Sequence, residues 1–267
     1  MPELPEVETI KNQLKEILPF RIKEIKSSKH LPQLLKLEEF SLKNLTIRDI
    51  SRYGKVLIFH LGEHHFLLSH LGMSGSWRIS TNAIYEKHKH LELINEKNYL
   101  TYVDPRRFGF LYIVGLKKKD EILSKLGMDV STAGFTHNYL YNVLLEHPHR
   151  KIKPLLLEQS LFAGIGNYMA NEICAHAGIR PMRLCHKIGK TESIKLYKAI
   201  IKVTQLSIKS RGVTFHGGYK DTHGEQGQGV LNLVVFHQPI CMLCKKTKVK
   251  IILLNQRGTY YCPTCQK

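Results

Sequence analysis

Four cysteines near the carboxyl end form the most specific chemical pattern in this sequence. Cys241 and Cys244 make one C-x-x-C pair, and Cys262 and Cys265 make a second pair after a spacer of seventeen residues. Each pair can present two thiolates to one metal ion, and two pairs complete a tetrahedral Zn²⁺ site with no open position. A redox-active C-x-x-C is the alternative, but it leaves the second pair without an explanation. We therefore expect one structural zinc ion.

The segment between the cysteine pairs, KVKIILLNQRGTYY, predicts two short strands. Residues 256–258 would join them as a hairpin and place Arg257 at its tip. A solvated side chain is the simpler interpretation of Arg257. Contact with a phosphate is favoured because the hairpin is basic and a guanidinium binds phosphate oxygens in pairs.

The first ten residues, MPELPEVETI, gather prolines and acids at the amino terminus. Removal of Met1 would leave Pro2 as a free secondary amine beside the carboxyl group of Glu3, which pairs a nucleophile with a proton source. An α-amino group titrates near pH ~8, well below lysine, so more of it is neutral in cells. Burial of Glu3 would raise its pKa and keep it protonated. Glu6 is expected to position this site, whereas the helix dipole better explains Glu8.

A glycine-rich motif, FAGIGNYMANE, lies between two amphipathic segments. Gly164 and Gly166 allow close approach of the backbone, and Asn167 is a suitable N-cap for a helix that runs to about residue 177. The amides at a helix N-terminus bind phosphate. Many loops end in a capped helix without binding a ligand, but the flanking helices favour a helix–two-turn–helix.

Two loops combine large apolar side chains with arginine. Met73 stands between glycines in HLGMSG, and Arg106 and Phe108 lie in DPRRFG. Proteins insert such apolar wedges beside arginines to unstack bases in DNA. A Met and a Phe that tuck under the edge of a sheet would give the same pattern, and these residues alone do not decide between the two.

Several other residues have a simpler structural interpretation. Lys55, at the start of an apolar strand, fits a snorkelling surface side chain. His88 and His90 would suit a second metal ion, but no other ligand supports one. Cys174 and Cys185 are isolated and fit inert thiols.

The composition favours a soluble protein that binds a polyanion. The 40 Lys and Arg exceed the 22 Asp and Glu, giving a net charge of +18. Nucleic acid explains this excess better than a membrane surface or a merely solvated face. The chain has no apolar run long enough to span a membrane and no signal-peptide pattern, so we expect a cytoplasmic protein without a membrane anchor.

The first half of the chain must position these groups with one helix and many strands. Apolar residues recur at helical spacing over residues 7–17, and Pro19 ends the pattern. Short, often alternating segments rich in β-formers follow from residue 21 to about 114. They predict an antiparallel sandwich or barrel.

The second half predicts helices. Residues 115–138 look like a connection with one short helix, and amphipathic helices follow it. The last of these would run from an N-cap at Thr191 to Gly212. Residues 213–229 are rich in glycine and poor in aliphatic residues, which predicts a flexible loop before the cysteine module.

Together these motifs resemble the bacterial formamidopyrimidine-DNA glycosylase family. They occur in order over nearly the whole chain as MPELPEVET, HLGMSGS, DPRRFG, KPLLLEQ with AGIGN, and the four-cysteine module ending in CPTCQ. The resemblance implies a base-excision-repair DNA glycosylase and AP lyase. Such an enzyme removes oxidised purines, chiefly 8-oxoguanine and formamidopyrimidines, from damaged double-stranded DNA. It would act as a monomer in the bacterial cytosol, associated with the nucleoid.

The resemblance also implies roles for individual residues. Pro2 would form a Schiff base with the sugar and Glu3 would act as the acid. Lys55 and Arg257 match residues assigned to β- and δ-elimination. The positions that match DNA contacts are His88, Arg106, Lys153 and Asn167, and those that fill the gap left by the extruded nucleotide are Met73, Arg106 and Phe108.

The implied fold is multi-domain α+β. An N-terminal helix and antiparallel β-sandwich over residues 1–128 would form the catalytic domain, followed by a hinge at 129–138. A helix–two-turn–helix DNA-binding domain would occupy 139–229, with a lesion-covering loop at 213–229. A β-hairpin zinc finger would occupy 230–267.

Two segments depart from the family pattern and leave the lesion preference open. The segment VVFHQPIC, which leads into Cys241, is shorter than in the family, and the 213–229 loop has an unusual sequence. One alternative is therefore the same mechanism with a preference for oxidised pyrimidines, as in endonuclease-VIII-like enzymes. The other is a non-catalytic zinc protein that binds lesions. The joint presence of Pro2, Glu3, Lys55 and Arg257 favours an enzyme.

Overall fold

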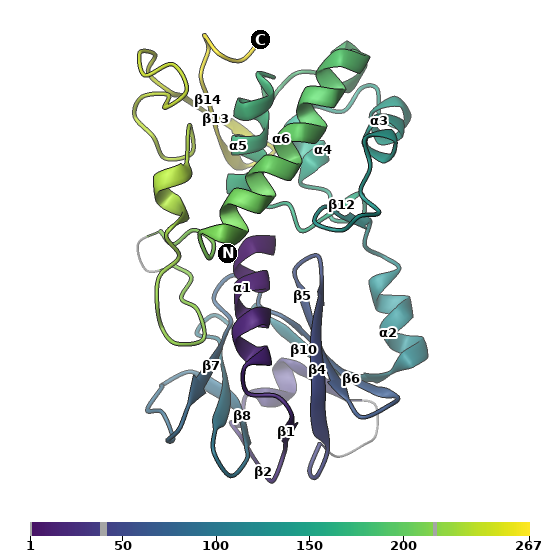
Figure 1. Cartoon of the computed structure of the whole chain (residues 1–267), viewed down its shortest axis with the longest axis vertical. Coiled ribbons are helices and arrows are strands. Elements are labelled where there is room, and N and C mark those ends of the chain that lie inside the picture. Colours follow the sequence, from purple (N-terminus) through teal and green to yellow (C-terminus); the bar gives the residue numbers. More distant parts are fainter. Residues whose placement is uncertain (1, 38–41, 216–217) are drawn as a thin grey trace. The chain divides into compact units, whose positions relative to one another are not determined.

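The computed structural model describes residues 2–37, 42–215 and 218–267 (Figure 1). Its contacts divide the chain into two compact units. The first contains Met1–Lys125 and Ser210–Gln228, and the second contains Leu126–Lys209 and Gly229–Lys267. In the described part of the chain, no helix is both long enough and apolar enough to cross a membrane.

The first unit is a sandwich of two sheets. In the larger sheet the strands lie in the order β1 (Phe20–Arg21), β4 (Thr46–Tyr53), β5 (Val56–Leu61), β6 (His65–His70), β10 (Phe110–Gly115) and β3 (Leu35–Leu37). In the smaller sheet the order is β2 (Glu24–Ser27), β8 (Lys89–Ile94), β9 (Tyr99–Val103) and β7 (Ser76–Ser80). Neighbouring strands are antiparallel, apart from the parallel pair of β10 and β3. The predicted antiparallel sandwich is confirmed, with β3 as an unforeseen parallel edge.

Large side chains from both sheets fill the sandwich. The Trp77 ring lies 5.1 Å from that of Phe59 and 5.2 Å from that of Tyr102, measured between ring centroids. Its indole N–H donates to Ser69 Oγ at 3.0 Å, so the buried polar atom is satisfied. This packing holds the ends of β6, β7 and β9 at fixed positions.

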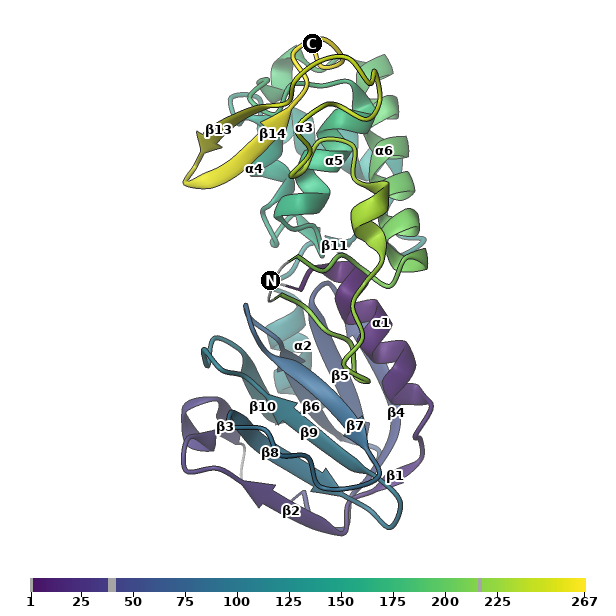
Figure 2. The same cartoon turned by 90° about the vertical axis from the view of Figure 1, so that its left-hand side faces the viewer.

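Helix α1 (Leu4–Lys15) lies over one edge of the sandwich, between the β7–β8 side and the β4–β6 side (Figure 1). Val7, Ile10 and Leu14 are fully buried, as their helical spacing predicts. Burial of each side chain contributes roughly 1.5–3 kcal/mol, which anchors the amino terminus to the sheet. Residues 218–228 form neither helix nor strand and run beside α1 (Figure 2). Helix α2 (Leu116–Leu123) completes this unit.

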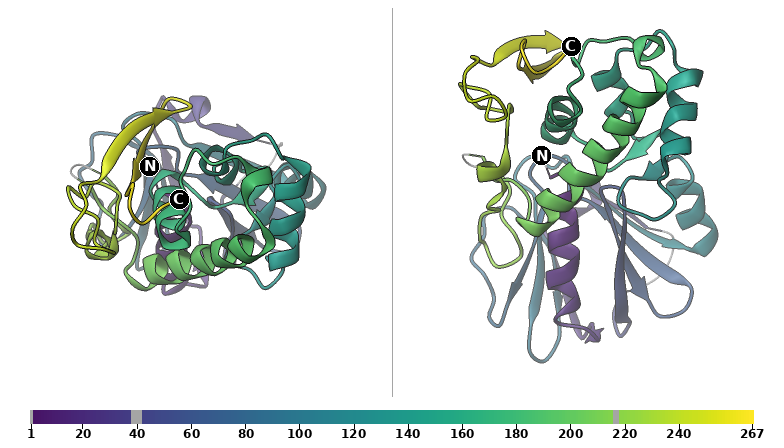
Figure 3. Two further views of the ribbon diagram at one scale, coloured as in Figure 1. Left: turned by 90° about the horizontal axis from the view of Figure 1, so that it is seen from above. Right: turned by 45° about the horizontal axis from the view of Figure 1, so that its top comes forward.

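The second unit is mainly helical. Its helices are α3 (His137–Glu146), α4 (Ile152–Leu156), α5 (Asn167–Ala177) and α6 (Lys190–Lys209), and a short parallel pair joins β11 (Met128–Asp129) to β12 (Phe162–Ala163). Among the described residues, 3-10 turns occur at Leu31–Gln33 in the first unit, and at Cys185–Lys187 and Gly229–Asn232 in the second. Helix α5 packs against α6 on one side and the C-terminal hairpin on the other (Figure 3).

Three details of the predicted helices are corrected. Gly166 is the N-cap of α5, so Asn167 is its first helical residue. Helix α6 starts at Lys190 and ends at Lys209, before Gly212. The Glu192 carboxylate accepts the N–H of Gly189, and this hydrogen bond stabilises a helix start before Thr191, the predicted N-cap.

The C-terminal hairpin consists of β13 (Lys250–Leu254) and β14 (Arg257–Tyr261). Its turn is formed by Asn255 and Gln256, which both have positive φ, rather than by residues 256–258. Such two-residue turns match the twist of the flanking strands. Arg257 therefore pairs with Leu254 as the first residue of β14, directly after the tip.

Candidate functional site

The amino end of α1 is a buried, acid-rich site. Pro2 and Glu3 are buried, and the Glu6 carboxylate is 1% exposed. One oxygen of Glu6 accepts the Glu3 N–H at 2.7 Å, and the other accepts the Val213 N–H at 2.6 Å. Glu6 thus fastens the first turn of α1 to residue 213. Met1, on whose removal the amine chemistry depends, lies outside the described residues.

Gly212 is required at its position by this carboxylate. Its φ is +79°, a conformation that residues with a side chain rarely adopt. A Cβ atom there would lie 2.4 Å from Glu6 Oε1. The glycine therefore allows the carboxylate to reach the N–H of Val213.

Pro2 lines a cavity of about 250 Å³ within the first unit. The wall combines strand ends and loops from distant parts of the sequence. Besides Pro2 it contains Met73, Ser74, Gly75, Ser76, Arg78, Glu86, Val103, Pro105, Gly218, Tyr219 and Lys220. The structure therefore places the predicted nucleophile and the predicted wedge Met73 around one space that also contains cationic and anionic side chains.

Lys55 is buried at the turn between β4 and β5, so the simpler prediction of a surface side chain is wrong. Burial, together with the charge of Lys55, lowers the pKa of His70 to about 4. The His70 ring stacks on Phe110 and its Nδ1 accepts the Gly72 N–H at 3.1 Å. A neutral His70 then carries its proton on Nε2, where it can donate to an incoming oxygen.

The two loops with predicted wedges are held together by Asp104. Its carboxylate accepts hydrogen bonds from the Ser74 hydroxyl at 2.5 Å and from the Gly109 N–H at 2.8 Å. The side chains of Met73 and Phe108 remain 47% and 56% exposed. The wedge interpretation is therefore favoured over tucking under a sheet edge, because a buried edge would hide both side chains.

Three basic residues accompany these loops. The guanidinium carbon of Arg106 lies 4.7 Å from the centre of the Phe108 ring, a cation–π contact. The carbonyl of His88 accepts the Asp104 N–H at 3.0 Å, which ties the turn before β8 to the same cluster. His90 is buried, and its ring nitrogens bond Ser28 Oγ and the Asp104 carbonyl. Both nitrogens of His90 are thus engaged within the fold.

In the second unit, a buried lysine links the glycine-rich motif to the hairpin. Lys153 is fully buried, and its Nζ donates to Asn167 Oδ1 at 2.9 Å, Thr259 Oγ1 at 2.8 Å and the Gly258 carbonyl at 3.2 Å. Asn167 Nδ2 also donates to Gly258. The three predicted residues Lys153, Asn167 and Arg257 are therefore brought to one place, because Gly258 follows Arg257 directly.

The four cysteines of the second unit converge. Their sulfur atoms all lie within 4.8 Å of one another, and two of the pairs are 3.9 Å apart. A tetrahedral site with metal–sulfur bonds of about 2.3 Å needs sulfurs about 3.8 Å apart, so the cluster fits such an ion. Backbone N–H groups of Lys246 and Thr247 lower the pKa of Cys244 to about 6, whereas burial raises the pKa of Cys241. Among the described residues, no other group of three or more potential ligands occurs.

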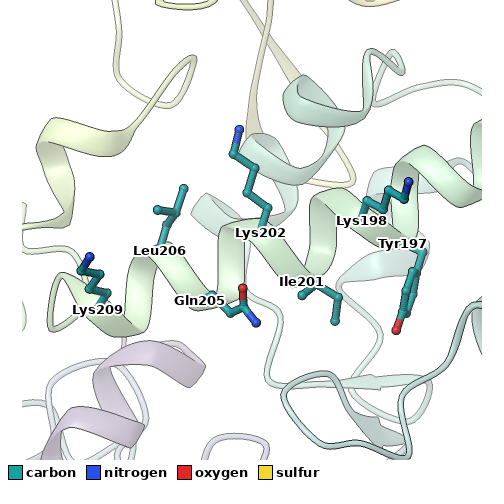
Figure 4. Close-up of a pocket in the computed structure, with 7 residues that line it drawn as sticks. All are labelled: Tyr197, Lys198, Ile201, Lys202, Gln205, Leu206 and Lys209. Atoms are coloured by element: carbon teal, nitrogen blue, oxygen red, sulfur yellow. The ribbon is translucent and has the colours of Figure 1, made fainter.

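A second concavity of about 550 Å³ lies along α6 (Figure 4). Successive helical turns supply its lining of Tyr197, Lys198, Ile201, Lys202, Gln205, Leu206 and Lys209. This lining contains no carboxylate, imidazole or thiol. The cavity at Pro2 differs in having a carboxylate, Glu86, in its wall.

Two family models match this chain. The formamidopyrimidine-DNA glycosylase N-terminal domain matches residues 1–111, and the formamidopyrimidine-DNA glycosylase H2TH domain matches residues 126–217. The chain belongs to the formamidopyrimidine-DNA glycosylase family. Both the predicted family and the mixed α+β fold with a helix–two-turn–helix domain are confirmed.

Relatives of known name agree over their full lengths. A formamidopyrimidine-DNA glycosylase of Syntrophomonas wolfei is 38% identical over 275 residues and is covered completely, as is this chain. A Lactococcus lactis mutant of this enzyme, solved with DNA containing Fapy-dG, has a TM-score of 0.91 at 32% identity over the whole of both chains. The wild-type L. lactis enzyme, solved with DNA containing an oxidised pyrimidine, has a TM-score of 0.89 at 32% identity, again over both whole chains.

Sequence reasoning missed two residues that organise the site. His70 and Asp104 both stand inside the motifs SHLGMSG and DPRRFG, beside the glycine, arginine and apolar residues that carry the predictions made from these motifs. The signal available was a polar residue at the end of each strand, directly before a glycine- or arginine-rich loop. Their partners come from other strands, so only the structure reveals what they hold.

Proposed function

We propose that this protein excises oxidised bases from duplex DNA, chiefly 8-oxoguanine and formamidopyrimidines, and then cleaves the strand by β,δ-elimination. The observation that carries the proposal is the cavity at Pro2, where the amino end of α1 meets acidic, basic and wedge side chains in one fold unit. The family of this chain supports it, as does the relative solved with a formamidopyrimidine lesion.

The proposed reaction begins with the amine of Pro2 once Met1 has been removed. The neutral amine attacks C1′ of the damaged nucleotide, the base departs with a proton, and the sugar opens as an iminium on Pro2. Glu3 is the proposed proton donor, and its burial suits a carboxyl group that stays protonated. Glu6 positions both residues through the Glu3 N–H.

The iminium acidifies the C2′ proton, and elimination then breaks the adjacent phosphate ester. We assign Lys55 to the first elimination and Arg257 to the second. The buried Lys55 lies where its charge acts on His70, and a neutral His70 supplies a donor beside it. Arg257 is exposed next to the hairpin turn, where its guanidinium is accessible to a phosphate.

We assign binding of the DNA phosphate backbone to cationic side chains and to amide groups of the protein. We assign phosphate binding to Lys153 and Asn167, which are joined by a hydrogen bond, and Asn167 stands at the positive end of α5. His88 and Arg106 serve the same role near the wedges. Met73 and Phe108 would fill the space vacated by an extruded nucleotide, with Arg106 beside them.

We infer that the cysteine cluster binds one zinc ion. Cys241, Cys244, Cys262 and Cys265 would hold it, and the ion would stabilise the fold of this segment, since four thiolates leave no open position for catalysis. The proposed domains are those expected from the sequence, with catalysis in 1–128, a hinge at 129–138, DNA binding in 139–229 and the zinc module in 230–267, although residues 210–228 pack with the first unit. We further propose a monomer of the bacterial cytosol.

A preference for oxidised pyrimidines is the second candidate. It is favoured by one observation, the relative solved with DNA containing an oxidised pyrimidine. The two candidates share every step at the sugar and differ only in which base the cavity accepts. Rates on matched duplexes that carry either class of lesion distinguish them.

Borohydride trapping on abasic DNA tests the mechanism. The mature protein should form a covalent adduct, and Pro2→Gly, which replaces the secondary amine held in the proline ring with a more mobile primary amine, should reduce trapping by about tenfold. In a form that keeps Met1, the Pro2 nitrogen is part of a peptide bond, so this form should trap at least about a hundredfold less. Equal trapping by the form that keeps Met1 would show that Pro2 is not the nucleophile.

A further inference from the structure

Part of the wall of the Pro2 cavity is supplied by a segment without regular structure. Gly218, Tyr219 and Lys220 line the cavity, and they open residues 218–228, which we call the strap. The many glycines of residues 213–229 predict a flexible loop. The strap instead has buried polar contacts with the body of the first unit.

Gln13 of α1 makes the first anchor. Its Nε2 donates to Asp221 Oδ2 at 2.7 Å, while its Oε1 accepts both the Thr222 N–H at 3.1 Å and Thr222 Oγ1 at 2.8 Å. All three residues are buried, with Asp221 and Thr222 at most 2% exposed. One amide side chain thus joins two consecutive strap residues to the helix that begins at the reactive amine.

Strand β7 makes the second anchor. Arg78 donates to the Asp221 carbonyl, and the Ile79 N–H donates to the Thr222 carbonyl at 3.1 Å. Asp221 Oδ1 also accepts the N–H groups of His223 and Glu225, which shapes the turn that follows. Such a buried network favours one arrangement, because any displacement leaves donors or acceptors unpaired.

The outer end of the strap differs. Arg211 and Glu225 form an ion pair of 3.2 Å, but both side chains are more than half exposed. Exposed ion pairs contribute little to a fixed position. The position of the cavity wall therefore depends on the contacts of Asp221 and Thr222, which directly follow Tyr219 and Lys220.

We propose that Gln13 and Asp221 are positioning residues that determine base recognition, by holding Tyr219 and Lys220 in the wall of the Pro2 cavity. The inference rests on the proposed function. A damaged base must fit against this wall before it is expelled, whereas an abasic site has no base to fit. Loss of the anchor should therefore slow base excision and spare the chemistry of Pro2 on an abasic sugar.

The test compares two substrates under single-turnover conditions. Gln13→Leu removes the three hydrogen bonds at similar size, and Asn12→Leu, at the exposed neighbouring position, is the matched control. Gln13→Leu should lower excision from 8-oxoguanine or formamidopyrimidine duplexes by about tenfold, the effect of unpairing buried groups. Its cleavage of abasic duplex should stay within about twofold of wild type. Asn12→Leu should change neither rate.

Hydrogen exchange of the DNA-free proteins gives an independent measurement. Amides of residues 221–225 should exchange faster in Gln13→Leu than in wild type. In Asn12→Leu they should exchange at the wild-type rate. Parallel loss of both activities, unchanged excision, or unchanged exchange in Gln13→Leu would overturn the inference. A wild-type protein that cleaves abasic DNA but excises no oxidised base would instead overturn the proposed function.

Discussion

Each unit of the molecule buries a glutamate whose carboxylate accepts backbone N–H groups. Glu6 in the first unit accepts from Glu3 and Val213, two residues far apart in the sequence. Glu172 on α5 of the second unit accepts from three consecutive residues, Val234, Val235 and Phe236, at 2.7–3.0 Å. Burial raises the pKa of Glu172, and the three N–H groups oppose that rise.

The difference lies in what each carboxylate holds. Glu6 joins the end of α1 that carries the proposed nucleophile to the segment leading into the strap. Glu172 joins α5 to the chain entering the cysteine module, where Val234 and Val235 pack with Cys241 and Cys262. The same interaction therefore orders the proposed catalytic end of α1 in one unit and the segment that leads into the four-cysteine cluster in the other.

The largest effect is expected from the loss of one cysteine of the four-cysteine cluster. Cys262→Ser should lower the bound zinc from about one ion per chain to nearly none, because structural zinc contributes roughly 10–16 kcal/mol of apparent binding energy. Metal analysis and hydrogen exchange over residues 230–267 would measure this. Cys185→Ser, at an isolated buried thiol, is the control and should keep its metal. Full zinc occupancy in Cys262→Ser would refute the ligand set.

The two carboxylates can be compared directly by Glu172→Gln and Glu6→Gln. Each replaces an acceptor oxygen with an N–H donor that faces a backbone N–H, at a cost of about 1–3 kcal/mol in the free energy of unfolding. Glu6→Gln should in addition slow abasic cleavage by about a hundredfold, the usual scale of misplaced acid–base groups.

Denaturant unfolding and single-turnover cleavage measure the two effects. Glu172→Gln, assayed well below its unfolding midpoint, should lose less than about tenfold in cleavage at saturating protein. The comparison fails if Glu172→Gln is the slower enzyme of the two.

A smaller effect is expected on acidification. Burial, with a nearby lysine charge, lowers the pKa of His70 in the first unit and of His176 in the second to about 4, from 6.5. The unfolded chain then binds more protons than the folded one between pH 6.5 and 4, so stability falls as the pH falls through this window.

The slope is at most about 1.4 kcal/mol per pH unit for each histidine. Unfolding measured from pH 7 to 4 should therefore show a shallower decline in His70→Asn and in His176→Asn than in wild type. An unchanged slope in either variant would show that its histidine does not contribute.

The sequence predicted the parts of the site that lie within short motifs. Cys241, Cys244, Cys262 and Cys265 were identified from spacing alone, since two residues between ligands suit one metal edge. The buried face of α1 followed from helical periodicity. The sequence did not predict the parallel pairing of β3, because nothing local specifies which distant strand a three-residue segment joins.

Residue type and spacing by themselves determined the family, the strand-rich first half, the helical second half and the residues able to do chemistry. Short-range geometry decides those features, because helix period, strand alternation and ligand spacing involve neighbours. The tertiary structure alone decided that Glu6 reaches Val213, that Gln13 holds Asp221, and that Lys153 meets Gly258. Each of these contacts joins residues roughly a hundred or more positions apart, where burial makes an unpaired polar group costly and so selects its partner.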